Sequence, residues 1–136
     1  MPLTDDFDHY LLIGDESALP AIGRRVEGLR GGVPVTTVVV VDGPEHVQSF
    51  ETRADWSPVW AFRRGEHADD ATLLRRALTG WAAPSGDGYV WIAAEAGVAR
   101  RLRDHMLEDR GHPKAWLKAA GYWVRGKAGA HEKIDA

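Results

Sequence analysis

An uninterrupted run of β-branched residues constrains the fold of this chain more than any other feature. Residues 36–41 are threonine or valine throughout, and Asp42-Gly43-Pro44 ends the run. A strand without polar–apolar alternation has to be covered on both faces, as in parallel sheets that helices flank. The run therefore predicts a strand buried between two layers of helix.

Other apolar runs alternate with amphipathic segments along the rest of the chain. Strands that alternate with helices imply right-handed crossovers and a mostly parallel sheet. The prediction is a three-layer α/β, Rossmann-like domain whose five-stranded, mostly parallel sheet has the order 3-2-1-4-5. The further strands are expected at residues 9–13, 58–62, 89–94 and 117–123, and the helices at residues 17–29, after Asp69 and Asp70, and at residues 96–110.

The length of the chain fits one domain of this kind. With 136 residues there is room for a moderate core and little room for a second domain. We expect residues 9–126 to form the domain, and residues 1–8 and 127–136 to be flexible termini.

Composition narrows the possible functions. The formal net charge of −3 argues against sequence-independent binding of nucleic acid. The chain has no cysteine, which excludes disulfides and thiolate metal sites, and its six histidines show no metal-ligand spacing with carboxylates. No secretory signal and no membrane-length apolar segment is visible, so we expect a cytoplasmic protein without membrane insertion. No catalytic acid, base or nucleophile is predicted.

The carboxyl ends of the five expected strands carry the residues of interest. In doubly wound sheets, ligands bind beyond these ends, where the strand order reverses. A helix N-terminus, cations, carboxylates and aromatic rings at one edge suit a nucleotide. The candidate cofactor-binding residues are Gly14, Asp15, Glu16 and Ser17 after the first strand, Asp42 after the second, Arg63 and Arg64 after the third, Ala94 and Glu95 at the fourth, and Tyr122 and Trp123 at the fifth.

The turn after the first strand has two interpretations. Ser17 and nearby backbone N–H groups could hold a pyrophosphate at the start of a helix, with Ser17 as its N-cap. An ordinary strand-to-helix turn would use the same residues, and Asp15 and Glu16 would repel an anion. These two carboxylates could instead cap the helix or bind ribose hydroxyls.

Asp42 and the two arginines point to opposite cofactors. A carboxylate after the second strand is typical of a hydrogen bond from a ribose 2′-hydroxyl, which favours NADH. Arg63 and Arg64 could bind the 2′-phosphate of NADPH, or they could form a solvated charged turn. The sequence leaves both cofactors open.

The residues at the ends of the fourth and fifth strands also have two interpretations each. Glu95 could cap the helix that follows or line a nicotinamide pocket. Tyr122 and Trp123 could lie near a flavin or complete the hydrophobic core.

Three segments resemble a known family in order and spacing. They are GDESALPAI at residues 14–22, GYVWIAAEA at residues 88–96 and GYWVRG at residues 121–126. Together they resemble the C-terminal domain of the siderophore-interacting protein family, flavin-dependent ferric-siderophore reductases related to the ferredoxin–NADP reductase superfamily. The resemblance covers about residues 9–126. Ala94 stands where the family often has glycine, which would add a methyl group beside the cofactor.

The resemblance implies that this domain binds NADPH or NADH and presents the nicotinamide to a flavin. In the family a preceding β-barrel holds the flavin, usually through an Arg-x-Tyr-Thr/Ser-x-Arg segment. None of the tyrosines here has an arginine two positions before it. FAD would therefore come from a partner.

The expected function is an NAD(P)H-binding module that passes hydride to a flavin on another chain or in free form, with a ferric siderophore as the indirect partner. The alternative is a non-catalytic module for nucleotide sensing, docking or dimerisation, and the surface that would face a barrel could support a homodimer.

Overall fold

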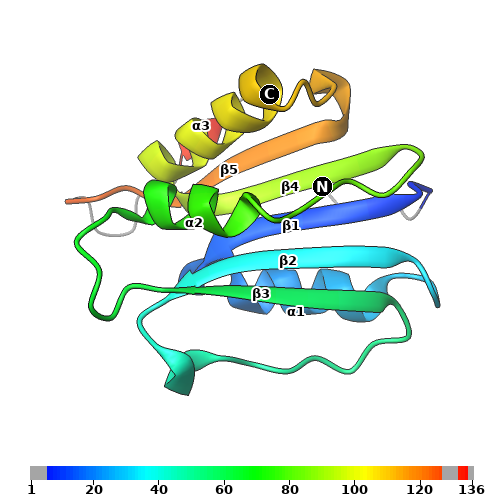
Figure 1. Cartoon of the computed structure of the whole chain (residues 1–136), viewed down its shortest axis with the longest axis horizontal. Coiled ribbons are helices and arrows are strands. Elements are labelled where there is room, and N and C mark those ends of the chain that lie inside the picture. The colour runs from blue at the N-terminus through cyan, green and yellow to red at the C-terminus, as the bar shows by residue number, and fades with distance from the viewer. Residues whose placement is uncertain (1–5, 127–131, 135–136) are drawn as a thin grey trace.

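Five parallel strands form the centre of the fold in the computed structural model, which describes residues 6–126 and 132–134 (Figure 1). The sheet order is β3-β2-β1-β4-β5-β6, with the short last strand antiparallel to β5. The predicted α/β class, parallel sheet and order of five strands are confirmed. The strands are β1 (His9–Asp15), β2 (Pro34–Val41), β3 (Asp55–Phe62), β4 (Gly88–Glu95), β5 (Leu117–Trp123) and β6 (Glu132–Ile134).

The sixth strand was not expected. Its three residues lie in the polar segment 127–136, where no apolar run marks a strand, and it pairs with the outer edge of β5. The rest of the expected flexible termini, residues 1–5, 127–131 and 135–136, lies outside the described residues. Within the described lead-in, Phe7 packs on the rings of Tyr89 and Trp116.

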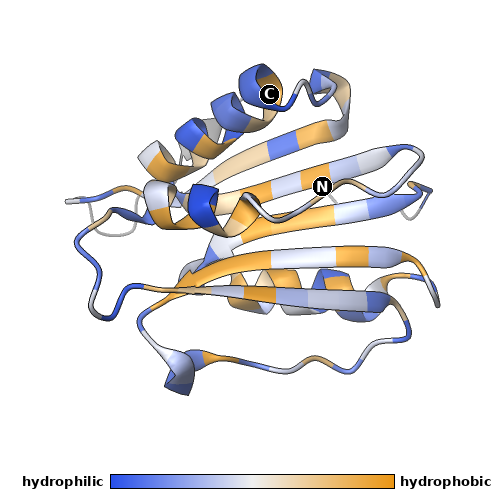
Figure 2. Cartoon of the chain, viewed as in Figure 1, coloured by the Kyte–Doolittle hydropathy of each residue, from blue (hydrophilic) through white to orange (hydrophobic). Residues whose placement is uncertain are grey.

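Helices cover both faces of the sheet. Helix α1 (Leu19–Gly28) packs on one face, and α2 (Asp70–Leu78) and α3 (Ala96–Asp104) pack on the other (Figure 1). Alternate valines of β2 enter the two cores, Val38 on the α2–α3 side and Val39 on the α1 side. The expected burial of this strand on both faces is therefore confirmed. Figure 2 shows the hydrophobic residues along the central strands and hydrophilic residues on the outer surface of α3.

Short 3₁₀ and π-helical turns lie between several of the helices and strands. A 3₁₀ turn, η1 (Glu16–Ala18), precedes α1, so this helix begins two residues later than predicted from Ser17. Helix α3 continues as a π-helical turn, η3 (His105–Asp109), which lengthens it toward the predicted end. Two further 3₁₀ turns, η2 (Pro44–His46) and η4 (Lys114–Trp116), follow β2 and precede β5.

Gly14 allows β1 to approach its neighbours closely. A Cβ atom at this position would lie 2.6 Å from the backbone oxygen of Ala93 in β4 and 3.0 Å from the Cβ of Ala18. The glycine is therefore needed for packing between β1, β4 and η1, whether or not a ligand approaches the turn.

We expect Gly14→Ala to lower the free energy of unfolding by about 2 kcal/mol, because the backbone of β4 has to move away from the added methyl group. Urea denaturation measures the change. Gly28→Ala is the matched control, since nothing lies within 4 Å of a Cβ at Gly28 and alanine favours the helix there. Equal effects of the two substitutions would contradict this account of Gly14.

His112 connects the turn after η3 to the start of β5. Its Nε2 lies 3.0 Å from the carbonyl oxygen of Trp116 and donates to it in the neutral ring. Burial lowers the pKa of His112, and the nearby His9 acts in the same direction, while the hydrogen bond to Trp116 opposes them. The folded protein therefore favours the neutral ring.

Because the unfolded chain protonates this histidine at a higher pH, near 6.5, stability is present above that value and is lost as the pH falls below it. We expect the free energy of unfolding to fall less between pH 7.5 and 5.5 in His112→Gln, whose amide can still donate to Trp116, than in the unsubstituted protein. Urea titrations at both pH values compare the two. An identical loss in both proteins would show that other groups set the pH dependence.

Candidate functional site

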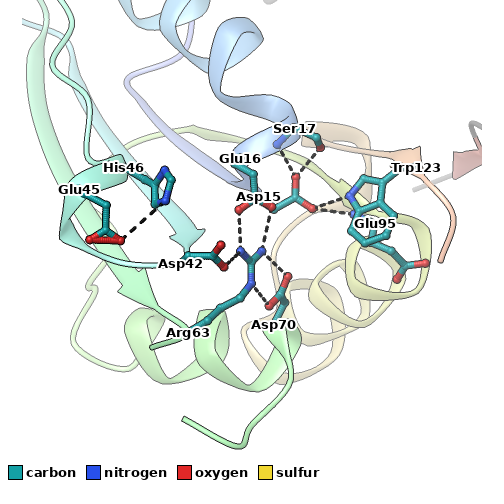
Figure 3. A network of polar contacts seen from close by, with 10 residues as sticks. All are labelled: Asp15, Glu16, Ser17, Asp42, Glu45, His46, Arg63, Asp70, Glu95 and Trp123. Atoms are coloured by element: carbon teal, nitrogen blue, oxygen red, sulfur yellow. Dashed lines mark hydrogen bonds and ion pairs between the residues drawn. The ribbon is translucent and has the colours of Figure 1, made fainter. Parts of the chain in front are cut away.

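Asp15 links three strands at the carboxyl edge of the sheet. It is the last residue of β1, is fully buried, and accepts four hydrogen bonds (Figure 3). One carboxylate oxygen accepts from the backbone N–H of Ser17 at 3.0 Å and from the Ser17 hydroxyl. The other accepts from the backbone N–H of Glu95 at 3.1 Å and from Nε1 of Trp123 at 2.9 Å. Asp15 therefore caps η1, and Ser17 is not the N-cap of α1 that the sequence suggested.

A register shift in β5 brings Trp123 to this carboxylate. Ala94 pairs with Gly121 whereas Glu95 pairs with Trp123, so Tyr122 is an extra residue in β5. A bulge of this kind turns the next side chain in a new direction. The indole N–H of Trp123 thereby donates to Asp15. Neither interpretation from the sequence, a flavin contact or a place in the hydrophobic core, included this hydrogen bond.

Glu95 serves as the N-cap of α3, as one of its two interpretations held. Its Oε1 accepts from the backbone N–H of Val98 at 3.2 Å, and its Oε2 accepts from the backbone N–H of Arg125 at 3.1 Å. The side chain is buried and both oxygens have partners. The carboxylate therefore joins β4, α3 and the chain beyond β5.

Asp15→Asn should lower the free energy of unfolding by about 2–3 kcal/mol, because the amide NH₂ would face an N–H donor in a buried position. Urea denaturation followed by tryptophan fluorescence reports both stability and the surroundings of Trp123. Asp87→Asn is a matched control at an exposed position, where the same change should have almost no effect. A loss below about 0.5 kcal/mol for Asp15→Asn would contradict a central role for this carboxylate.

Arg63 is the centre of a second network, beside the first. All five N–H donors of its guanidinium are directed at carboxylates (Figure 3). Nε and one terminal nitrogen contact Asp70, each at 2.8 Å. The terminal nitrogens contact Glu16 at 2.6 and 3.0 Å, and one of them contacts Asp42 at 2.9 Å. Asp70 foremost, and then Glu16, raise the pKa of Arg63 above its ordinary value, against the opposing effect of burial.

The register of β2 and β3 explains how Asp42 and Arg63 meet. Val41 pairs with Phe62, so each strand places its next residue at the same level. Successive side chains leave a strand on opposite sides. Arg63 lies toward Asp70 at the start of α2, while Arg64 forms an ion pair with Glu45 of η2.

Among the described residues of this network, three carboxylates surround one guanidinium, which leaves two negative charges in excess. Asp42 and Glu16 face solvent, with side chains 70% and 48% exposed, whereas the side chain of Asp70 is only 11% exposed. Asp70 therefore anchors Arg63, and the two exposed carboxylates are the groups that a ligand would meet first.

The other candidate residues pack in the core. Ala94 is fully buried on the α2–α3 side, so its methyl group contacts the core rather than a ligand. Tyr122 is half-buried against Trp91, with ring centroids 6.0 Å apart in an edge-to-face arrangement. Gly14 lies under η1, as described above.

Asp70 is the site residue that the sequence did not identify. The sequence placed a helix directly after Asp69 and Asp70, where an acidic residue is a typical N-cap. Asp69 accepts the N-cap bond, from the backbone N–H of Thr72 at 2.9 Å. A pair of acidic residues where one cap suffices was the available signal. The ion pair between Asp70 and Arg63 could not be predicted, because it depends on how the chain runs between β3 and α2.

Within residues 6–126 and 132–134, no three histidine, aspartate or glutamate side chains lie where they could hold a metal ion. No helix in this part of the chain is long and apolar enough to cross a membrane.

Comparison with known proteins decides the family. The family model described as siderophore-interacting protein matches residues 7–126. This chain belongs to the siderophore-interacting protein family. The resemblance that the three sequence segments suggested is thus confirmed.

Relatives of this siderophore-interacting domain include proteins of very different length. It is 33% identical over 131 residues to the mycobactin import ATP-binding/permease protein IrtA of Mycolicibacterium smegmatis, covering 93% of this chain and 14% of that protein. It is 26% identical over 121 residues to the NADPH-dependent ferric-chelate reductase of Escherichia coli, covering 88% of this chain and 45% of the reductase. The chain therefore spans less than half of either relative.

A solved structure agrees with the fold. The siderophore utilization protein from T. fusca superposes with a TM-score of 0.81 at 32% identity, over 94% of this chain and 49% of that one.

Proposed function

We propose that this domain binds a nicotinamide dinucleotide and serves as the hydride-donating module of a flavin-dependent ferric-siderophore reductase. The family membership and the name of the E. coli relative support the reaction class. The observation that carries the proposal is the pair of solvent-facing carboxylates, Glu16 and Asp42, held beyond the carboxyl ends of β1 and β2, where doubly wound sheets bind dinucleotides.

The residues at this edge fit the ribose part of such a cofactor. Arg63 engages only one oxygen of Asp42, and the other has no hydrogen bond among the described residues. That oxygen can accept from a ribose hydroxyl. The N–H and hydroxyl of Ser17 are already donated to Asp15, so Ser17 offers a pyrophosphate neither donor. We therefore assign ribose binding to Asp42 and Glu16 and no phosphate contact to Ser17.

A bound nicotinamide would supply a hydride, which, by way of a flavin, is enough to reduce two Fe(III) ions by one electron each with the release of one proton. The protein supplies position and electrostatics. Arg63 orients Asp42 and Glu16, while Asp15 and Glu95 fix the ends of β1, β4 and β5 around which the cofactor would lie. The flavin would come from another chain or from free FAD.

A docking or nucleotide-sensing module is the second candidate. The observation that favours a docking module is that Arg63, Asp15 and Glu95 make their hydrogen bonds to other parts of the domain and are not open to a ligand. A module of this kind would need neither hydride transfer nor flavin.

Calorimetric titration with NADH and with NADPH, each with and without FAD, separates the two candidates. The reductase module should bind at least one nucleotide saturably, with a dissociation constant on the order of 1–100 μM, and should reduce added FAD at a rate that saturates with the nucleotide. Nucleotide binding without any flavin reduction would favour the sensing module. The absence of binding to either nucleotide would exclude the reductase module.

A further inference from the structure

The Arg63 network has a consequence for the choice of nicotinamide dinucleotide. NADPH differs from NADH only by a 2′-phosphate on the adenosine ribose, and proteins that select NADPH place a cation beside that phosphate. From the sequence, Arg63 was a candidate for binding this phosphate, together with Arg64, whereas Asp42 favoured NADH. The structure joins these two residues in one ion pair, with 2.9 Å between Nη1 and Oδ1.

Arg63 has no N–H left for a phosphate. Its donors are shared among Asp70, Glu16 and Asp42, and its side chain is only 26% exposed. To bind a phosphate, Arg63 would have to give up a hydrogen bond to Glu16 or Asp42, because its bonds to Asp70 compensate an almost buried carboxylate. Arg63 therefore acts as a positioning residue for the carboxylates.

The groups that face solvent here are negative. Asp42 and Glu16 present their carboxylates outward, and the neighbouring Arg64 is paired with Glu45. The Glu45 carboxylate also lies close to His46 (Figure 3). A phosphate carrying close to two negative charges would approach a surface that already has two uncompensated ones. Repulsion of the 2′-phosphate weakens the binding of NADPH alone, because NADH carries no such group.

We infer that this domain takes NADH in preference to NADPH, with Asp42 as the specificity-determining residue and Arg63 as the group that holds it in place. The inference rests on the proposed function, because it concerns the same cofactor site. It separates this chain from the E. coli relative, whose name states a dependence on NADPH.

The test compares the dissociation constants of NADH and NADPH by calorimetry, with no turnover required. We expect NADH to bind at least about tenfold more tightly, a difference of about 1.4 kcal/mol. The ratio of the NADPH dissociation constant to the NADH dissociation constant should become smaller as the salt concentration rises from about 0.05 to about 0.5 M, because salt screens repulsion between exposed charges.

Asp42→Asn is the decisive variant, because its side chain is exposed and the fold should tolerate the change. It removes one negative charge, and its amide NH₂ cannot accept from a ribose hydroxyl, although its amide oxygen can still accept from Arg63. The ratio of the NADPH to the NADH dissociation constant should therefore fall about tenfold, through tighter NADPH binding and weaker NADH binding. Asp87→Asn, which changes the net charge equally at the amino end of β4, is the matched control and should leave the ratio unchanged.

Arg64→Ala tests the second arginine that the sequence suggested for the 2′-phosphate, because its exposed ion pair with Glu45 could open at little cost. A selective loss of NADPH affinity in Arg64→Ala would overturn the inference, as would equal or tighter binding of NADPH by the unsubstituted protein. Both results would leave the proposed function intact. Failure of both nucleotides to bind would instead remove the proposed function, and the inference with it.

Discussion

The buried carboxylate of Asp15 is the interaction on which the carboxyl edge of this domain depends. It satisfies donors from η1, β4 and β5, three elements that meet at the point where the strand order reverses. A buried charge is tolerable only when its hydrogen-bonding capacity is filled, and four donors fill it here. The bulge in β5 and the N-cap of α3 are arranged around that requirement.

The network of Arg63 with Asp70, Glu16 and Asp42 also pairs charged groups with one another, but it lies partly in solvent. Asp15 is fully enclosed, whereas Glu16, the next residue, already faces outward and contacts Arg63. The two networks therefore adjoin along the chain but differ in their surroundings, one serving the core and the other shaping the surface. In both, the acceptors are carboxylates, which makes the edge negative although many dinucleotide sites rely on backbone N–H groups.

The sequence predicted the order of the five parallel strands well because each strand contains an apolar run, and residues 36–41 could only be a buried strand. It placed the start of β3 three residues late, at residue 58, because Asp55 and Ser57 are polar. It placed Asp42 and Arg63 at one edge but not in contact, because contact depends on the Val41–Phe62 register. Gly14 was a candidate cofactor-binding residue, whereas the structure explains the glycine by the close approach of the Ala93 carbonyl. The β5 bulge depends on tertiary structure and left no sequence signal. The acidic pair Asp69 and Asp70 was a signal, but it did not identify Arg63 as the partner of Asp70.

The two roles of Asp42 affect how nucleotide preference can change within this family. The same side chain completes the coordination of Arg63 and presents an oxygen to solvent. A lineage that exchanged it for a neutral or basic residue would alter the electrostatic balance of Glu16 and Asp70 at the same time. Changes of nucleotide preference should therefore appear as linked substitutions among these four positions, and single replacements should be rare along the path.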